Sequence, residues 1–225
     1  MKRKYSKINY RVCRLPDKPI VYVLRGENGD MLIDTGRKLS VHNIDKWIRE
    51  SGYNIKWVFL THGHFDHAYN ALYFQRKYGA EVILHEKDKE IFYGTDYPKI
   101  IPSSDKYKLV AQSAEVLIHK TLVPICKINY SVTDNDTDLL RKLGFDADIV
   151  MLPGHTYGSM GILQDRVLYS GDACSAIGGD YYTAIFGYDI DLLLQSEKKI
   201  FELNPLIIAP GHGKLIINER AFFEK

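Results

Sequence analysis

Seven short, mainly apolar runs recur along the sequence, many of them bounded by glycine, aspartate or proline. They are residues 19–24, 31–34, 56–62, 81–85, 148–153, 166–170 and 206–210. Continuous apolar runs of this length are typical of strands that are buried in a sheet. They therefore predict a largely buried β-sheet as the framework of the chain.

Amphipathic patterns between several of these runs predict helices. The first helix begins after Ser40, which can cap it, and ends at Gly52. The second covers about 68–78. The third begins near Asp189 and is stopped by Pro205. Because strands alternate with helices, the sequence predicts an α/β fold.

The region 86–147 has a different pattern. It contains one clear amphipathic segment, 106–119, together with several prolines and a polar stretch at 133–138. The residues expected on the inner face of this helix are Leu109, Val110, Ser113, Ala114 and Leu117. We interpret 86–147 as an insertion within a single domain of residues 1–225, and we expect part of it to form a lid over a site.

The composition excludes several classes of protein. The 225 residues are 45% hydrophobic and 26% charged, which matches a globular domain, and the net charge of +2 predicts no attraction to nucleic acid or to a membrane surface. No apolar run is long enough for a membrane span or a signal peptide. The three cysteines lie far apart without a CxxC pair, which does not indicate a disulfide framework. We therefore expect a cytoplasmic protein.

The segment THGHFDHAYN, residues 61–70, concentrates possible metal ligands directly after a predicted strand. His62, His64, Asp66 and His67 lie within six positions of the loop that leads into the next helix. Ligands of α/β proteins bind outside the carboxyl ends of strands. Neutral imidazole and carboxylate are preferred ligands of zinc and similar divalent ions, so the segment predicts a metal site.

Three further residues occur in the same setting. His155, Asp172 and His212 each follow a predicted strand and lie beside a glycine, within the segments PGHT, SGD and PGHG. A glycine lets the backbone turn sharply and approach a metal closely. These residues are therefore expected to complete the site.

Together these segments resemble the metallo-β-lactamase superfamily. The HxHxDH motif is present at residues 62–67, and the later motifs of the family are matched at 153–161, 168–172 and 209–213. Asp34, Thr35 and Gly36 match its early DTG motif, and the resemblance extends from about residue 20 to residue 215. It implies a four-layer αβ/βα sandwich, in which two mixed β-sheets are flanked by helices.

The resemblance also implies how the ligands are shared between two divalent metal ions. His62, His64 and His155 would bind the first ion, Asp66, His67 and His212 the second, and Asp172 would bridge them. Zn²⁺ suits these ligands best, and Mn²⁺ or Fe²⁺ is also compatible with them. Asp34 is expected either to orient a ligand through a hydrogen bond or to be a turn residue at the end of its strand.

Such a site predicts a dinuclear metal-dependent hydrolase. Hydroxide held between the ions would attack the carbonyl of a small-molecule ester, lactone or thioester, and Asp66 would hold the nucleophile in line as a catalytic residue. Secreted β-lactamases often have a cysteine where this chain has Asp172, so the site resembles more closely the glyoxalase II and lactonase branch. Tyr157, Tyr181 and Tyr182 can line a substrate pocket, although packing is the more common role of such rings.

Other functions remain compatible with the same ligands. Some members of the superfamily hold a single iron and oxidise sulfur compounds such as persulfides, and others hydrolyse phosphodiesters. A metal-binding or sensing module without turnover is a further alternative. It is disfavoured because every ligand of the motif is present.

Overall fold

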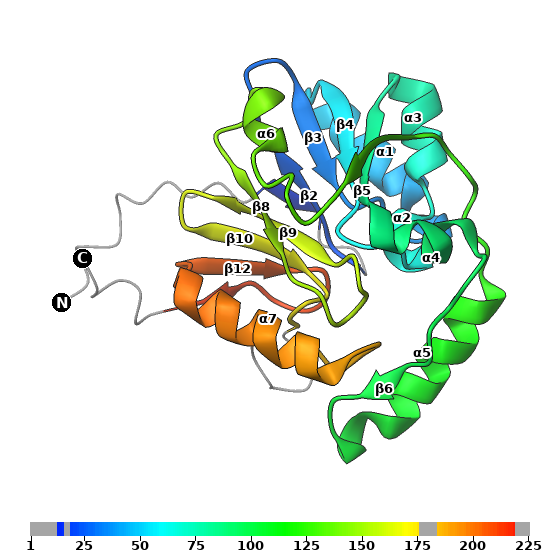
Figure 1. Cartoon of the computed structure of the whole chain (residues 1–225). Coiled ribbons are helices and arrows are strands. Elements are labelled where there is room, and N and C mark those ends of the chain that lie inside the picture. Colours follow the sequence, from blue (N-terminus) through cyan, green and yellow to red (C-terminus); the bar gives the residue numbers. More distant parts are fainter. Residues whose placement is uncertain (1–12, 16–18, 176–183, 219–225) are drawn as a thin grey trace.

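Two mixed β-sheets lie face to face in the computed structural model, which describes residues 13–15, 19–175 and 184–218 (Figure 1). The strands of the first sheet, in spatial order, are β1 (Cys13–Leu15), β2 (Val21–Leu24), β3 (Asp30–Ile33), β4 (Ile55–Phe59), β5 (Glu81–His85) and β7 (Ile128–Val132). The first three are antiparallel neighbours, and the last four run parallel to one another.

The second sheet has five strands. In spatial order they are β13 (Ile216–Ile217), β12 (Ile207–Pro210), β10 (Val167–Gly171), β9 (Met160–Gln164) and β8 (Asp148–Met151). Only β10 and β12 are parallel neighbours. Each of the seven predicted runs overlaps a strand, whereas β1, β7, β9 and β13 of these two sheets were not predicted.

The side chains of the strands alternate between two cores. In β2, Tyr22 and Leu24 lie between the two sheets, whereas Val21 and Val23 face the helices outside the first sheet. This alternation is the two-residue period of a strand. Because apolar residues occupy both positions, the strands are buried on both faces.

Helices cover the outer face of each sheet, as Figure 1 shows. α1 (Val41–Ser51) and α3 (Ala71–Tyr78) pack Ile48 and Phe74 against the first sheet, and α7 (Ile190–Leu203) packs Ile200 against the second. The layers are therefore helix, sheet, sheet and helix. This confirms the predicted α/β class and four-layer sandwich.

The predicted helix ends are correct in part. Asp189 caps α7 by accepting a hydrogen bond from the Leu192 amide, and Gly52 ends α1 in the left-handed conformation. Ser40 precedes α1 but its side chain makes no capping bond, so that prediction was wrong. The second predicted helix is divided into α2 (Phe65–Ala68) and α3, because the Asn70 side chain binds backbone carbonyls from Thr35 to Arg37.

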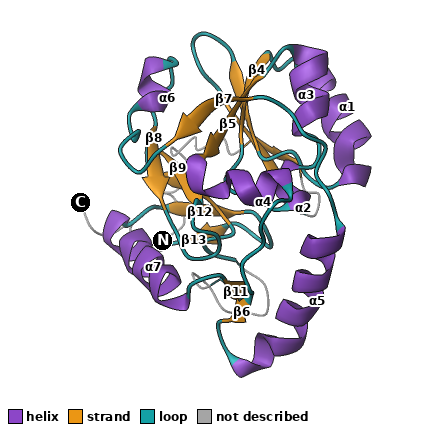
Figure 2. Ribbon diagram, turned by 45° about the vertical axis from the view of Figure 1, so that its right-hand side comes forward, coloured by secondary structure: helices purple, strands orange, loops and turns teal. Residues whose placement is uncertain are grey.

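The region 86–147 contributes one strand to the first sheet, and its other elements lie outside the two large sheets. β7 pairs with β5 and so belongs to the first sheet. Before it come η2 (Glu86–Asp88), α4 (Lys89–Tyr93), β6 (Ile101–Pro102), η3 (Asp105–Tyr107) and α5 (Lys108–Lys120), and after it comes α6 (Leu139–Lys142). In Figure 2, α5 stands at the edge of the molecule, next to β6 and its partner β11 (Phe186–Gly187).

The inner face predicted for α5 was correct only in part, since Ala114 packs against a small apolar cluster but the leucines of that face are exposed. Leu109 and Leu117 are 77% and 54% exposed, whereas the buried residues of the helix are Ala111 and Ile118. The helix packs on a small cluster that includes Ile100 and not on a broad sheet, so only a narrow face is covered. No helix in the described part of the chain is long and apolar enough to cross a membrane.

Candidate metal centre

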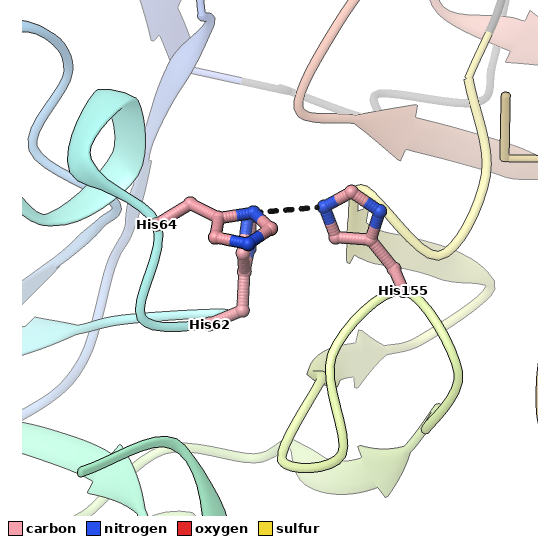
Figure 3. Close-up of side chains that lie close together, drawn as sticks. All are labelled: His62, His64 and His155. Carbon is pink, nitrogen blue, oxygen red and sulfur yellow. Dashed lines mark hydrogen bonds between the residues drawn. The ribbon is translucent and has the colours of Figure 1, made fainter. Parts of the chain in front are cut away.

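Three histidines from two loops form the first group of candidate ligands. His62 and His64 lie between β4 and α2, and His155 lies in the turn between β8 and β9. Their nitrogen atoms lie within 4.8 Å of one another, and His64 Nδ1 is 3.1 Å from His155 Nε2 (Figure 3). The predicted first triad is therefore assembled from loops that belong to different sheets.

The second group lies beside the first. His212 Nε2 is 3.3 Å from Asp66 Oδ2 and 3.3 Å from His67 Nε2. The carboxylate of Asp172 connects the groups, because its Oδ2 is 3.4 Å from His212 Nε2 and 3.7 Å from His155 Nε2. All seven predicted ligands thus converge, four from the loop and helix α2 that follow β4 of the first sheet and three from loops of the second.

The four buried imidazoles are each oriented by a partner on their other nitrogen. The pairs are His62 Nδ1 with Thr61 Oγ1 at 3.1 Å, His64 Nε2 with Tyr188 OH at 2.9 Å, His67 Nδ1 with Asp34 Oδ2 at 2.8 Å, and His155 Nδ1 with Phe186 O at 3.0 Å. Such partners fix the tautomer and the ring orientation of metal-binding histidines. The other nitrogen of each ring therefore points into the group of candidate ligands to which the histidine belongs.

Two buried atoms of the cluster support this interpretation. His62 Nε2 and Asp172 Oδ1 have no hydrogen-bond partner within the described ranges. Buried polar atoms are normally satisfied, since leaving one unpaired costs about 1–3 kcal/mol. A cation bound by both atoms would remove this cost, so the side chains fit a divalent metal.

The imidazoles of the first group are in the form that metals bind. Burial, reinforced by the neighbouring His155, lowers the pKa of His64 to about 3, and burial also lowers the pKa of His62 and His155. These rings are therefore neutral at neutral pH, and each offers a lone pair.

The second group favours positive charge at its centre. Burial alone would raise the pKa of Asp66, but the imidazoles of His67 and His212 lower it to about 2. Burial would lower the pKa of His67, but nearby carboxylates, with Asp172 the strongest, raise it. The carboxylates are ionised, and their negative charge favours the protonated form of the neighbouring imidazoles. The same negative charge would stabilise a bound cation.

The carboxylate of Asp34 lies within hydrogen-bond distance of a candidate ligand, His67, which agrees with the first of its two predicted roles. Besides His67, its carboxylate accepts hydrogen bonds from the amide and the hydroxyl of Thr61, and the residue has a φ of 60°. A non-glycine residue in this conformation is strained, and the three donors hold it there. Asp34 therefore links the strand end of β3 to the ligand loop.

Asp88, a residue that the sequence analysis missed, fastens the two ligand loops together. Its fully buried carboxylate accepts hydrogen bonds from the amides of Gly63 and Gly158 and from the hydroxyl of Thr156. Burial raises its pKa to about 6 despite these three donors. A Cβ on Gly158 would lie 2.7 Å from the Asp88 carboxylate, so the glycine permits this contact.

Of the tyrosines predicted to line the pocket, Tyr157 alone lies among the described residues. Tyr157 is 39% exposed and lies outside the cavity lining described below, and Tyr181 and Tyr182 lie outside the described residues. Tyr188 was missed, although it is buried and bonds to His64. Its position in the tyrosine-rich segment before α7 was the only signal, and the segment alone did not single out this ring.

A cavity of about 190 Å³ opens beside the two groups. His64, Asp66, His155, Asp172 and His212 form one side of it. Because candidate ligands from both groups reach this space, a molecule bound there would lie directly against any metal they hold.

Comparison with known proteins agrees with this geometry. The model of the metallo-beta-lactamase superfamily matches residues 17–212. The chain belongs to the metallo-beta-lactamase superfamily. Within it, hydroxyacylglutathione hydrolase GloC of Haemophilus influenzae is 29% identical over 192 residues, which is 83% of this chain and 81% of that protein. The probable metallo-hydrolase YflN of Bacillus subtilis is 25% identical and covers 91% of this chain and 80% of its own length.

Solved structures of the superfamily share the fold. The B3 metallo-beta-lactamase BLEG-1 is 24% identical, with a TM-score of 0.63 and 92% of each chain covered. TTHA1623, crystallised in a di-iron-bound form, is 21% identical, with a TM-score of 0.66 and 92% and 94% covered. The superfamily match and the metallo-hydrolase relatives identify this chain as a metal-dependent hydrolase.

Proposed function

We propose that the chain is a dinuclear hydrolase that cleaves an ester, lactone or thioester of a small molecule. The observation that carries the proposal is the position of Asp172, whose Oδ2 lies 3.7 Å from His155 of one triad and 3.4 Å from His212 of the other. One carboxylate between two triads is the arrangement expected for a pair of ions. Zn²⁺ is the metal we expect, because the ligands are imidazole and carboxylate.

The chain's own side chains would divide the work around such ions. When bound, the ions supply the Lewis acidity that activates water and polarises the scissile carbonyl. Asp66 lies on the cavity with its side chain 22% exposed, and its pKa of about 2 keeps it ionised. It can therefore accept a hydrogen bond from the attacking water and orient it toward the carbonyl.

The relatives support hydrolysis of an acyl bond. The GloC relative is named a hydroxyacylglutathione hydrolase, and such an enzyme acts on an acyl compound. We propose that this chain cleaves the same class of bond, without requiring that the substrate contain glutathione. The neutral cavity wall beside the ligands is compatible with esters, lactones and thioesters alike.

Elemental analysis of protein purified without chelators or affinity metals tests the number and kind of ions. About two zinc or manganese ions per chain are expected. A single iron, together with oxygen consumption in the presence of a persulfide, would contradict the proposal and favour the iron oxygenase.

Two ligand variants test the chemistry. Asp172→Ala and His67→Ala should each lower hydrolysis of a panel of esters, lactones and thioesters by more than about 100-fold, which is the upper range for the loss of a ligand's supporting partner. His42→Ala is the matched control, because His42 is exposed on α1, and it should retain full activity. Unchanged turnover in both ligand variants would refute the proposal.

A further inference from the structure

The cavity beside the candidate ligands has two chemically different sides. Among the residues that the structure describes, the lining consists of the five candidate ligands, seven apolar side chains and Ser175. Neither lysine nor arginine is present among the described lining residues. A charged group held against the apolar side, away from the candidate ligands, would therefore lose its hydration without gaining a partner, which is costly.

The apolar side comes from two separate elements. α5 contributes Ala114, Leu117 and Ile118, and the segment that contains β11 contributes Ile185 and Phe186. In Figure 2 these elements lie side by side at one edge of the molecule, and they share a small apolar cluster. Leu117 is 54% exposed although it lines the cavity, which places it at the opening.

The size of the cavity limits what it can enclose. Its volume of about 190 Å³ is comparable with that of a ~150 Å³ apolar cavity that binds one benzene molecule. A group of about six non-hydrogen atoms fits this space. A peptide or a nucleotide is several times larger and would have to remain outside the opening.

One polar atom of the lining has no partner. Ser175 is 5% exposed, and its hydroxyl makes no hydrogen bond within the part of the chain that the structure describes. A buried hydroxyl without a partner is costly, and a neutral oxygen or nitrogen of a bound molecule would satisfy it. The lining therefore suits a mainly apolar group that carries one neutral polar atom.

We propose that this cavity binds the acyl group of the substrate, and that this group is neutral, apolar and about six non-hydrogen atoms long. The inference rests on the proposed hydrolase function. In the proposed arrangement, the short acyl group of the substrate lies in the cavity and the leaving group lies outside the opening. In it, Ala114 and Leu117 are the side chains that set the length of the acyl group.

An acyl series with a constant leaving group tests the length. The kcat/KM of p-nitrophenyl esters should rise about fourfold for each methylene from acetate to hexanoate, since burying a methylene contributes about 0.8 kcal/mol. It should fall again for decanoate, which exceeds the cavity. Hemisuccinate esters, which are anionic, should be hydrolysed at least about tenfold more slowly than butyrate esters. Equal values along the series would overturn the inference and leave the hydrolase intact.

Substitutions on α5 test the location. Ala114→Phe fills the cavity and should lower kcat/KM for hexanoate by at least about 30-fold relative to acetate, because the extra volume displaces the chain. Val116→Phe is the matched control, since Val116 lies on the same helix but is 51% exposed and outside the lining. The same change in both variants would overturn the location. Thermal unfolding of each variant establishes that it is folded.

Binding of hexanamide, which the enzyme should not cleave, separates this inference from the proposed function. Saturation-transfer NMR should detect hexanamide on the parent protein and on Val116→Phe, and should detect neither hexanamide on Ala114→Phe nor succinamate on any of them. This result would support the cavity assignment even if no ester were hydrolysed. Equal binding of hexanamide by Ala114→Phe and the parent would refute it.

Discussion

The ligand side of the cavity and the α5 side hold their residues in different ways. Among the candidate ligands behind the cavity, His67 is fully buried, and its Nδ1 lies 2.8 Å from Asp34 Oδ2. On the α5 side only Ala111 and Ile118 of the helix are buried, while Leu109 and Leu117 are mostly exposed. One side is fastened by directional hydrogen bonds, and the other packs through a narrow apolar contact.

The two sides therefore meet different requirements. The ligand side must position metal ions for the reaction, and the α5 side selects the substrate. Metal ligands must be held within a few tenths of an ångström, which requires partners that fix their rotamers. An apolar wall needs only approximate shape, because hydrophobic contact is not directional. Substitutions on α5 can therefore change the substrate without disturbing the candidate ligands.

The largest effect is expected from Asp34→Ala on the ligand side. Removing this carboxylate leaves the Thr61 amide and His67 without their buried acceptor, so the free energy of unfolding should fall by about 3 kcal/mol. Affinity for metal should fall about 10–100-fold. Urea denaturation and a metal titration measure the two effects.

Asp165→Ala is the control for the backbone at position 34. Asp165 also has a positive φ, 51°, but it is exposed in the turn between β9 and β10. The strain of an alanine with a positive φ should therefore lower the free energy of unfolding of both variants. Metal affinity, by contrast, should fall only in Asp34→Ala. Equal metal affinity in the two would show that Asp34 does not orient His67.

A pH-dependent effect is expected from Asp88, which joins the two ligand loops. Its pKa is raised from 3.8 to about 6 in the folded state, so the folded protein binds more protons than the unfolded chain between these values. Its contribution to the free energy of unfolding should therefore be largest below pH 4 and should fall by about 3 kcal/mol as the pH rises through 6.

Comparison of the parent protein with Asp88→Asn isolates this contribution. The variant lacks the titrating group, so the difference in stability between the two proteins should shift in favour of Asp88→Asn as the pH rises from 4 to 7. Urea denaturation of both at several pH values measures the shift. A difference that is constant with pH would show that Asp88 is ionised throughout this range.

A smaller effect is expected from Tyr188→Phe, where the two sides of the cavity meet. The hydroxyl lies 2.9 Å from His64 Nε2, so its removal should weaken metal binding by about fivefold, or about 1 kcal/mol. Tyr157→Phe should leave metal binding unchanged, because Tyr157 is 39% exposed and no hydrogen bond between the described residues joins it to a candidate ligand. Isothermal titration with Zn²⁺ distinguishes the two, and equal affinities would remove Tyr188 from the support of His64.

The smallest effect is expected from Leu109→Ser on the exposed face of α5. Leu109 is 77% exposed, so the free energy of unfolding should change by less than about 0.5 kcal/mol. Thermal unfolding at two protein concentrations measures it. A larger loss that depends on concentration would show that this face of α5 is covered by another chain in solution.

The candidate ligands could be predicted because each belongs to a local motif at a strand end. His155, Asp172 and His212 follow β8, β10 and β12, and parallel or adjacent strands bring such ends to one edge of a sheet. A short segment of sequence thus contained both the residue type and its place in the fold. The two mixed sheets were predicted through the family resemblance that these motifs carry.

The supporting residues could not be predicted in this way. Asp88 and Tyr188 lie outside the motifs, and each acts on a loop far away in the sequence, as Asp88 does on Gly158. Their roles depend on tertiary packing, which periodicity does not report. The face of α5 was predicted only in part for a related reason, since amphipathicity alone does not show whether a helix packs on a sheet or on a small cluster.

The origin of the ligands in both sheets has a consequence for the whole molecule. His62, His64, Asp66 and His67 come from the first sheet, and His155, Asp172 and His212 from the second, so a bound ion cross-links the two halves of the sandwich. Separation of the two sheets would release the ion. The free energy needed to separate them would therefore increase with the concentration of free ion. An ion at 100 times its dissociation constant adds about 2.7 kcal/mol, so the metal supply of the cell would also govern how long the chain survives proteolysis.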